Sequence, residues 1–192
     1  MDALVSDEEL AARLQSGDKD VFTVLFNRYE KKIQRYGQRF LYNYEDLEDA
    51  VQEVFIKTYK NIQSFTVSKK FSTWIYRIAH NTFINVIKKK GREPLSFFDF
   101  DVLIQLPTNP QPSIADDFLR LEDKELISRN LQTLAPKYRE PLVLFYLEEL
   151  DYKEISEILH LPTSTVGVRL GRAREALKKI IQANDPTYAQ RP

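Results

Sequence analysis

Residues 151–179 read DYKEISEILHLPTSTVGVRLGRAREALKK, and their pattern predicts two helices joined by a short turn. Asp151 followed by Glu154 is typical of a helix N-cap, Leu161-Pro162 breaks the first helix, and Thr163 is placed to cap the second. Apolar residues then recur at intervals of four, three, four and three, at Val166, Leu170, Ala173, Leu177 and Ile180. The stretch therefore predicts a helix-turn-helix whose second helix packs on the first through this stripe.

The other side of the second helix carries small and basic residues. Residues 163–182 contain five Lys/Arg and one acidic residue, Glu175. A basic helix can be merely solvated, but two capped helices with cations gathered on the second favour a recognition helix in the major groove of DNA. We predict DNA contacts by Ser164, Thr165, Gly167, Val168, Arg169, Gly171, Arg172, Arg174 and Lys178. Arg169, Arg174 and Lys178 are expected to meet phosphates, and Arg172 to meet base edges.

Helical spacing of apolar residues continues through most of the chain, which has five glycines. Prolines at 94, 107, 110 and 112 interrupt it between 91 and 118, where acidic residues outnumber basic ones. We therefore predict an all-α fold of two small helical domains joined by a flexible linker. The expected parts are residues 1–90, the acidic linker 91–118, residues 119–182 with the helix-turn-helix, and a tail at 183–192.

Composition excludes several classes of function. The chain has no cysteine and two histidines, so we expect no disulfide, no metal site and no cofactor. Basic and acidic residues balance at 28 each, which at first argues against nucleic-acid binding, but the charges are unevenly distributed along the chain. No apolar run is long enough for a membrane helix, and MDALVSDEEL lacks a signal core. The expected location is cytoplasmic, without membrane insertion.

Four segments together resemble the extracytoplasmic-function (ECF) sigma factors of the sigma-70 family, which direct bacterial RNA polymerase to promoters. They are DVFTVLFNRY (20–29), YEDLEDAVQEVFIKTYKNIQSF (44–65), FSTWIYRIAHNTFINVIKKKGR (71–92) and LAPKYREPLVLFYLEELDYKEISEILHLPTSTVGVRLGRAREALKK (134–179). The resemblance implies that 1–90 is a region 2-like domain that recognises and melts the −10 element, and that 119–182 is a region 4-like domain that reads the −35 element. It implies no catalytic residue and no small-molecule substrate.

The resemblance also assigns residues in the N-terminal half. Contacts to the melted −10 strand are expected from Lys69, Lys70, Ser72, Thr73, Arg77, Asn81 and Lys88, with Asn81 where similar proteins touch the flipped base. Trp74 is expected to be a core residue. The acidic face formed by Glu45, Glu48, Asp49, Gln52 and Glu53 resembles the surface that docks on a basic coiled coil of the polymerase β′ subunit. An ordinary solvated helix surface is its alternative.

Partners follow from the same resemblance. They are core RNA polymerase, through the β′ coiled coil and the β subunit, promoter DNA, and an anti-sigma factor that the linker would let both domains surround. The recognition helix departs from the family, which commonly has a basic residue at Gly167, Ser at Val168 and a bulkier residue at Gly171. We therefore expect its base code to differ, and we interpret the glycines as allowing close approach to DNA.

Two rival functions explain less of the sequence. A LuxR-type helix-turn-helix regulator explains 134–179 but leaves the N-terminal segments without a role. An enzyme of nucleic-acid metabolism would need converging carboxylates or a metal site, whereas the acids at 45–53 share one helix.

Overall fold

A computed structural model describes residues 5–90 and 129–184. Every regular element in these two ranges is helical, which confirms the all-α prediction. The chain divides into two compact units, an N-terminal and a C-terminal one, and each is described by itself. The expected linker at 91–118 lies outside the described residues, as does nearly all of the tail expected at 183–192. No helix in the described ranges is long and apolar enough to span a membrane.

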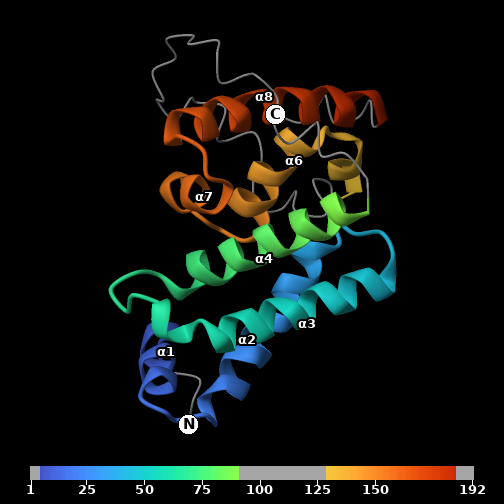
Figure 1. The fold of residues 1–192 in the computed structure, drawn as a ribbon. Helices are drawn as coiled ribbons and strands as arrows, with labels where there is room; N and C mark the ends of the chain where they lie inside the picture. The colour runs from blue at the N-terminus through green and yellow to red at the C-terminus, as the bar shows by residue number, and fades with distance from the viewer. Residues whose placement is uncertain (1–4, 91–128, 185–192) are drawn as a thin grey trace. The chain divides into compact units, whose positions relative to one another are not determined.

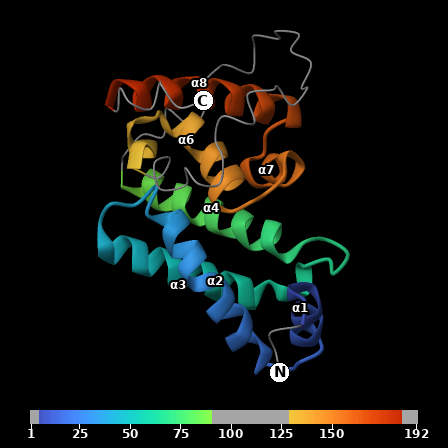
Figure 2. The same cartoon turned by 180° about the vertical axis from the view of Figure 1, so that it is seen from behind.

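The N-terminal unit contains four α-helices and a short 3-10 turn (Figures 1 and 2). These are α1 (Asp7–Gln15), α2 (Val21–Gly37), α3 (Tyr44–Lys60), η2 (Ile62–Ser64) and α4 (Phe71–Lys89). Ser6 caps α1, because its Oγ accepts a hydrogen bond from the Glu9 amide at 3.1 Å. Asn43 caps α3 in the same way, through the Asp46 amide.

Aromatic side chains fill the core where α2 and α4 meet. Tyr36 of α2 packs edge-to-face on Tyr76 of α4, with ring centroids 5.4 Å apart, and both rings are buried. A Cβ built on Gly37 would come within 2.6 Å of a Leu47 methyl carbon and 2.9 Å of the Phe83 ring. Gly37 therefore permits α2 to approach α3 and α4 closely. Trp74 is 8% exposed, which confirms that it is a core residue.

The C-terminal unit is built on one long helix (Figure 1). It contains η6 (Leu131–Thr133), α6 (Pro136–Leu142), the π-helical turn η7 (Val143–Leu147), α7 (Tyr152–Leu159) and α8 (Thr163–Asn184). The predicted cap of α7 is a complete capping box, in which Asp151 and Glu154 each accept the other's amide at 2.8 Å.

The packed side of α8 follows the predicted stripe as far as Leu177. Its last member is Ile181, which is fully buried, and not Ile180, which is half-buried. At about 100° per residue, positions 180 and 181 lie at nearly equal angles on either side of the stripe, so its period could not choose between them. The packing of the neighbouring helices determines that Ile181 is the buried residue.

Candidate nucleic-acid interfaces

The turn before α8 is fixed by its backbone. His160 has φ of 54° and closes α7 in the left-handed conformation, and Ser156 Oγ donates a hydrogen bond to the Leu161 carbonyl at 2.5 Å. Helix α8 begins at Thr163, so the residue predicted to be its N-cap is instead the first residue within the helix. These contacts set the direction in which α8 leaves the turn, and α8 is the helix that would enter a DNA groove.

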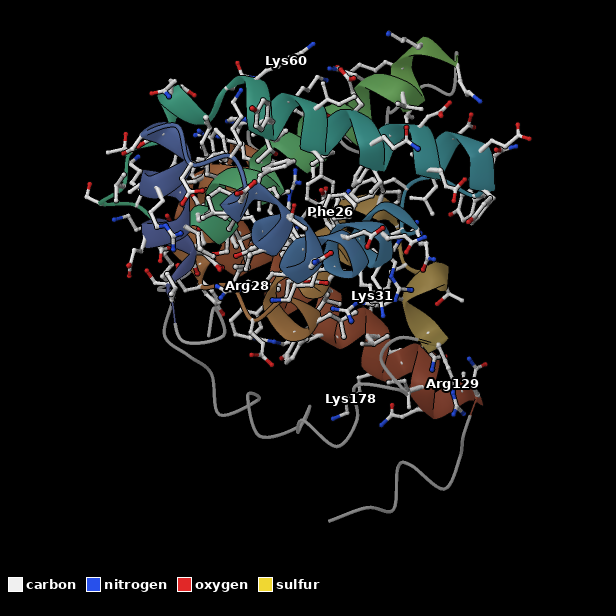
Figure 3. All side chains as sticks on the ribbon, turned by 90° about the horizontal axis from the view of Figure 1, so that it is seen from below. Phe26, Arg28, Lys31, Lys60, Arg129 and Lys178 are labelled. Carbon is white, nitrogen blue, oxygen red and sulfur yellow. The ribbon has the colours of Figure 1, made fainter. Side chains whose placement is uncertain are left out.

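Eight of the nine predicted DNA-contacting residues keep part of their surface open to solvent. Ser164 and Lys178 are exposed, and Figure 3 shows Lys178 extending outward from α8. The half-buried members are Thr165, Gly167, Val168, Gly171, Arg172 and Arg174. This side of α8 presents small side chains, accessible backbone and the guanidinium of Arg172 to a DNA groove. Further along α8, Lys178 adds a cation that can contact a phosphate.

Arg169 and Arg174 do not have the positions expected of phosphate contacts. Arg169 is 6% exposed, because it stands three residues after Val166 and four before Ala173, beside the packed stripe. Arg174 donates from Nε to the Tyr146 hydroxyl at 2.8 Å and lies 5.4 Å from the centre of the Phe145 ring. The Arg169 side chain is thus buried inside the C-terminal unit, and the Arg174 guanidinium is engaged there, where it binds η7 to α8.

On α4, four of the residues predicted to bind the −10 strand form one line along the helix. Lys70 stands at the N-cap, Arg77 follows after seven residues, Asn81 after four and Lys88 after seven more, which keeps them within about 60° of one another. Lys70, Asn81 and Lys88 are exposed and Arg77 is half-buried. Cations therefore flank an amide that can hydrogen-bond a base.

The other three residues predicted for the −10 strand differ in exposure. Lys69 is exposed and Ser72 half-buried, so both are accessible at the start of α4. Thr73 is 7% exposed, which leaves its side chain little surface for a nucleotide.

Two residues of α1 support this surface, and sequence reasoning missed both. Glu8 Oε1 accepts a hydrogen bond from the Phe71 amide at 2.9 Å and so caps α4, to which Lys70 contributes no side-chain cap. Gln15 Nε2 donates to the carbonyls of Ile62 and Phe65, each at 2.8 Å. No local sequence signal could reveal these bonds, since their partners lie about 50 or more residues away.

The predicted acidic face of α3 is exposed along its length. All five residues, Glu45, Glu48, Asp49, Gln52 and Glu53, are exposed. Two of them have partners on their own helix: Glu48 accepts from the Tyr44 hydroxyl at 2.5 Å, which raises the pKa of Tyr44, and Glu53 lies 3.3 Å from Lys57 Nζ. In the described part of the chain, Glu45 and Asp49 form no ion pair.

Apolar residues extend this face toward the end of α3. Ile56 is 46% exposed and Tyr59 39% exposed. The Tyr59 ring packs edge-to-face on Phe22 at the rim of the unit, with centroids 5.1 Å apart. An acidic surface that ends in exposed apolar side chains is suited to a basic protein partner.

Comparison with known proteins agrees with this arrangement. The model of Sigma-70 region 2 matches residues 25–93, and the model of Sigma-70, region 4, matches residues 124–177. The ECF RNA polymerase sigma factor SigW of Bacillus subtilis is 40% identical over 174 residues, 87% of this chain and 92% of SigW. The ECF RNA polymerase sigma-E factor of Escherichia coli K12 is 33% identical over 191 residues, 95% and 97% of the two chains.

Solved structures share the fold. CnrH, in a complex with the cytosolic domain of CnrY, superposes with a TM-score of 0.67 at 22% identity, over 93% of this chain and 99% of CnrH. RpoE of Bartonella quintana, in a complex with the anti-sigma factor NepR, gives 0.61 at 20% identity, over 85% and 98%.

The helical units and their family matches define a transcription initiation factor with sigma-70 regions 2 and 4. The chain belongs to the sigma-70 family, in its ECF group. It is therefore a sigma factor, a non-enzymatic protein that gives RNA polymerase its promoter specificity, with region 2 binding the −10 element and region 4 the −35 element. No cluster of His, Asp or Glu that could hold a metal occurs within the two described ranges.

Proposed function

We propose that particular surfaces of the two units carry these roles. Region 2, within residues 1–90, captures the melted −10 strand along the line of Lys70, Arg77, Asn81 and Lys88. Lys69 and Ser72 extend the contact at the start of α4. Region 4, within 119–182, places α8 in the −35 groove, and the acidic segment 91–118 connects the two regions.

On α8 the small residues bring backbone close to the bases, Arg172 reads a base edge, and Lys178 contacts a phosphate. The half-buried positions of Gly167, Val168 and Gly171 support this assignment, because a side of α8 that packed internally would be closed to solvent. Arg169 and Arg174 are left out of the DNA-contacting set, because Arg169 is buried and the guanidinium of Arg174 is engaged within the unit.

The acidic face of α3 docks on the basic coiled coil of the polymerase β′ subunit. The observation that carries this proposal is the exposure of all five acidic-face residues next to Ile56, on a helix whose other side is core. A self-sufficient regulator would have no use for such a face. An anti-sigma factor that covers the same face would keep the protein inactive, as befits the family.

The docking proposal is tested by neutralising the free acids. The Glu45→Gln/Asp49→Asn variant should bind core polymerase about tenfold more weakly, since charged pairs at an interface determine encounter and register. The matched control is Glu9→Gln/Asp20→Asn, which removes the same charge from exposed positions near the starts of α1 and α2. Binding is measured by fluorescence titration of labelled full-length protein with core enzyme. Equal affinities for the two variants would refute the docking surface.

Strand capture is tested separately at Asn81. Asn81→Ala should weaken binding of the holoenzyme to a pre-melted promoter about tenfold, and the loss should shrink when the −10 base it reads is changed. Asn27→Ala, an exposed asparagine on α2, is the control. A loss that is the same for every base would contradict a base contact by Asn81.

A further inference from the structure

The exposed side of α2 is divided by charge. At about 100° per residue, four cations occupy an arc of about 100°, while the remaining exposed arc is neutral apart from one acid. The basic arc, termed the α2 basic stripe, consists of Arg28, Lys31, Lys32 and Arg35. The other arc consists of Thr23, Asn27, Glu30, Gln34 and Gln38.

Within residues 5–90 and 129–184, part of the α2 basic stripe carries charge that no ion pair neutralises. Arg28 is committed, because its guanidinium lies 2.6 Å from Asp7 Oδ1 and donates to the Val5 carbonyl. Lys31, Lys32 and Arg35 are exposed, and Lys32 Nζ stands over the Tyr29 ring at 5.3 Å. Among the residues that the structure describes, Lys31 and Arg35 form no ion pair.

This arrangement works against the stability of α2. Lys31 and Lys32 stand four and three residues before Arg35, and like charges at these spacings repel and weaken a helix. If Glu30 and the glutamines alternated with the cations around the exposed side of α2, that repulsion would be removed without changing any core contact. An arc of positive charge without interspersed acids instead attracts a polyanion.

The α2 basic stripe lies along the flank of α2 that faces α4. On that flank Tyr29 packs on Phe71 and Tyr36 on Tyr76, both with centroids 5.4 Å apart. The Tyr36 hydroxyl is 3.5 Å from Nδ1 of His80, the residue before Asn81. Figure 3 shows Arg28 and Lys31 at the edge of α2 away from α3, whereas Phe26 points toward α3, where it packs on Phe55.

We propose that the α2 basic stripe is a second, sequence-blind contact of region 2 with the phosphate backbone of promoter DNA, beside the strand-capturing line on α4. From Arg28 to Arg35 the helix rises about 10 Å. One DNA strand spaces its phosphates about 3.4 Å apart along the axis, so the stripe can follow roughly three of them. The inference rests on the proposed strand capture by α4, which places the DNA next to this flank.

The test uses full-length protein assembled with core polymerase and measures promoter binding against salt concentration. Lys31→Gln/Arg35→Gln should weaken binding about tenfold at moderate salt. It should also lower the slope of log affinity against log salt by about 2, since each phosphate contact contributes about 0.9. Promoters with altered −10 bases should show the same loss. The control Lys19→Gln/Lys60→Gln removes two exposed cations outside the stripe, and Figure 3 shows Lys60 on α3. It should leave the slope unchanged.

A charge-conserving variant separates phosphate binding from packing. Lys31→Arg/Arg35→Lys should keep the wild-type slope, because a phosphate row accepts either cation as a point charge. A lowered slope in this variant would show that the two residues act through packing within the fold and not through their charge, and it would overturn the proposal. An unchanged slope in the Gln variant would do the same.

A weaker affinity for core polymerase in the Gln variant, with DNA binding intact, would identify an acidic protein as the partner and also overturn the proposal. If Asn81→Ala has no effect while the Gln variant behaves as expected, strand capture by Asn81 fails and the backbone contact stands.

Discussion

Gly171 lies inside the 22-residue helix α8, where glycine is about 1 kcal/mol less favourable than alanine. A Cβ built on it meets no atom within 4 Å, so no contact inside the protein requires a glycine there. Gly171→Ala should therefore stabilise α8 by roughly 1 kcal/mol. If DNA approaches the helix backbone at this point, the added methyl group should push the groove away. The loss of one base contact, about 1–3 kcal/mol, would then weaken −35 binding by roughly 5- to 150-fold.

Two measurements on the same variant check the reasoning. Amide hydrogen exchange in α8 should slow about fivefold, the factor that 1 kcal/mol gives at room temperature. Binding of the holoenzyme to −35 promoter DNA should fall. Gly37→Ala is the contrasting control, because its Cβ would overlap Leu47 and Phe83 and should destabilise the N-terminal unit by about 1–3 kcal/mol. Slower exchange in α8 together with unchanged or tighter DNA binding would refute the role of Gly171.

Three further outcomes are expected. His160→Gly should stabilise the C-terminal unit by about 1 kcal/mol in urea, since an L-residue with φ of 54° is strained, and an unchanged midpoint would contradict this. Arg174→Lys should destabilise the same unit by about 1–2 kcal/mol by losing the bond to Tyr146, with no change in the salt slope of DNA binding. A slope reduced by about 1 would restore Arg174 as a phosphate contact. Burial, and then the hydrogen bond to Asp7, raise the pKa of Tyr29. Because an unfolded tyrosine ionises near pH 10, this contribution to stability is complete below about pH 10 and is lost as the pH rises above it. Tyr29→Phe should remove that alkaline loss in a pH series of urea midpoints.

Local pattern was sufficient for the helices and for several of their ends. The capping box at Asp151 and Glu154 was correct because cap chemistry involves residues three apart in the sequence. The outward orientation of Glu45 and Asp49 followed from the period of α3. Local pattern did not predict the burial of Arg169. This residue lies at the edge of the packed stripe of α8, where the helical period alone does not distinguish a buried guanidinium from a solvated one.

An all-helical chain with two family-typical regions could be predicted from the amino-acid order alone, since amphipathic period, caps and motif order depend on residues close together in the sequence. Which cations remain available depends instead on how the helices pack together. Arg174 is engaged by Tyr146, 28 residues away, while Lys31 and Arg35 of α2 stand exposed along the flank that faces α4. The carboxylate that caps α4 comes from Glu8, 63 residues before Phe71. In each case hydrogen bonding and burial depend on which segments meet in space. A helical period predicts which face of one helix is apolar, but not which residues of other segments lie against that helix.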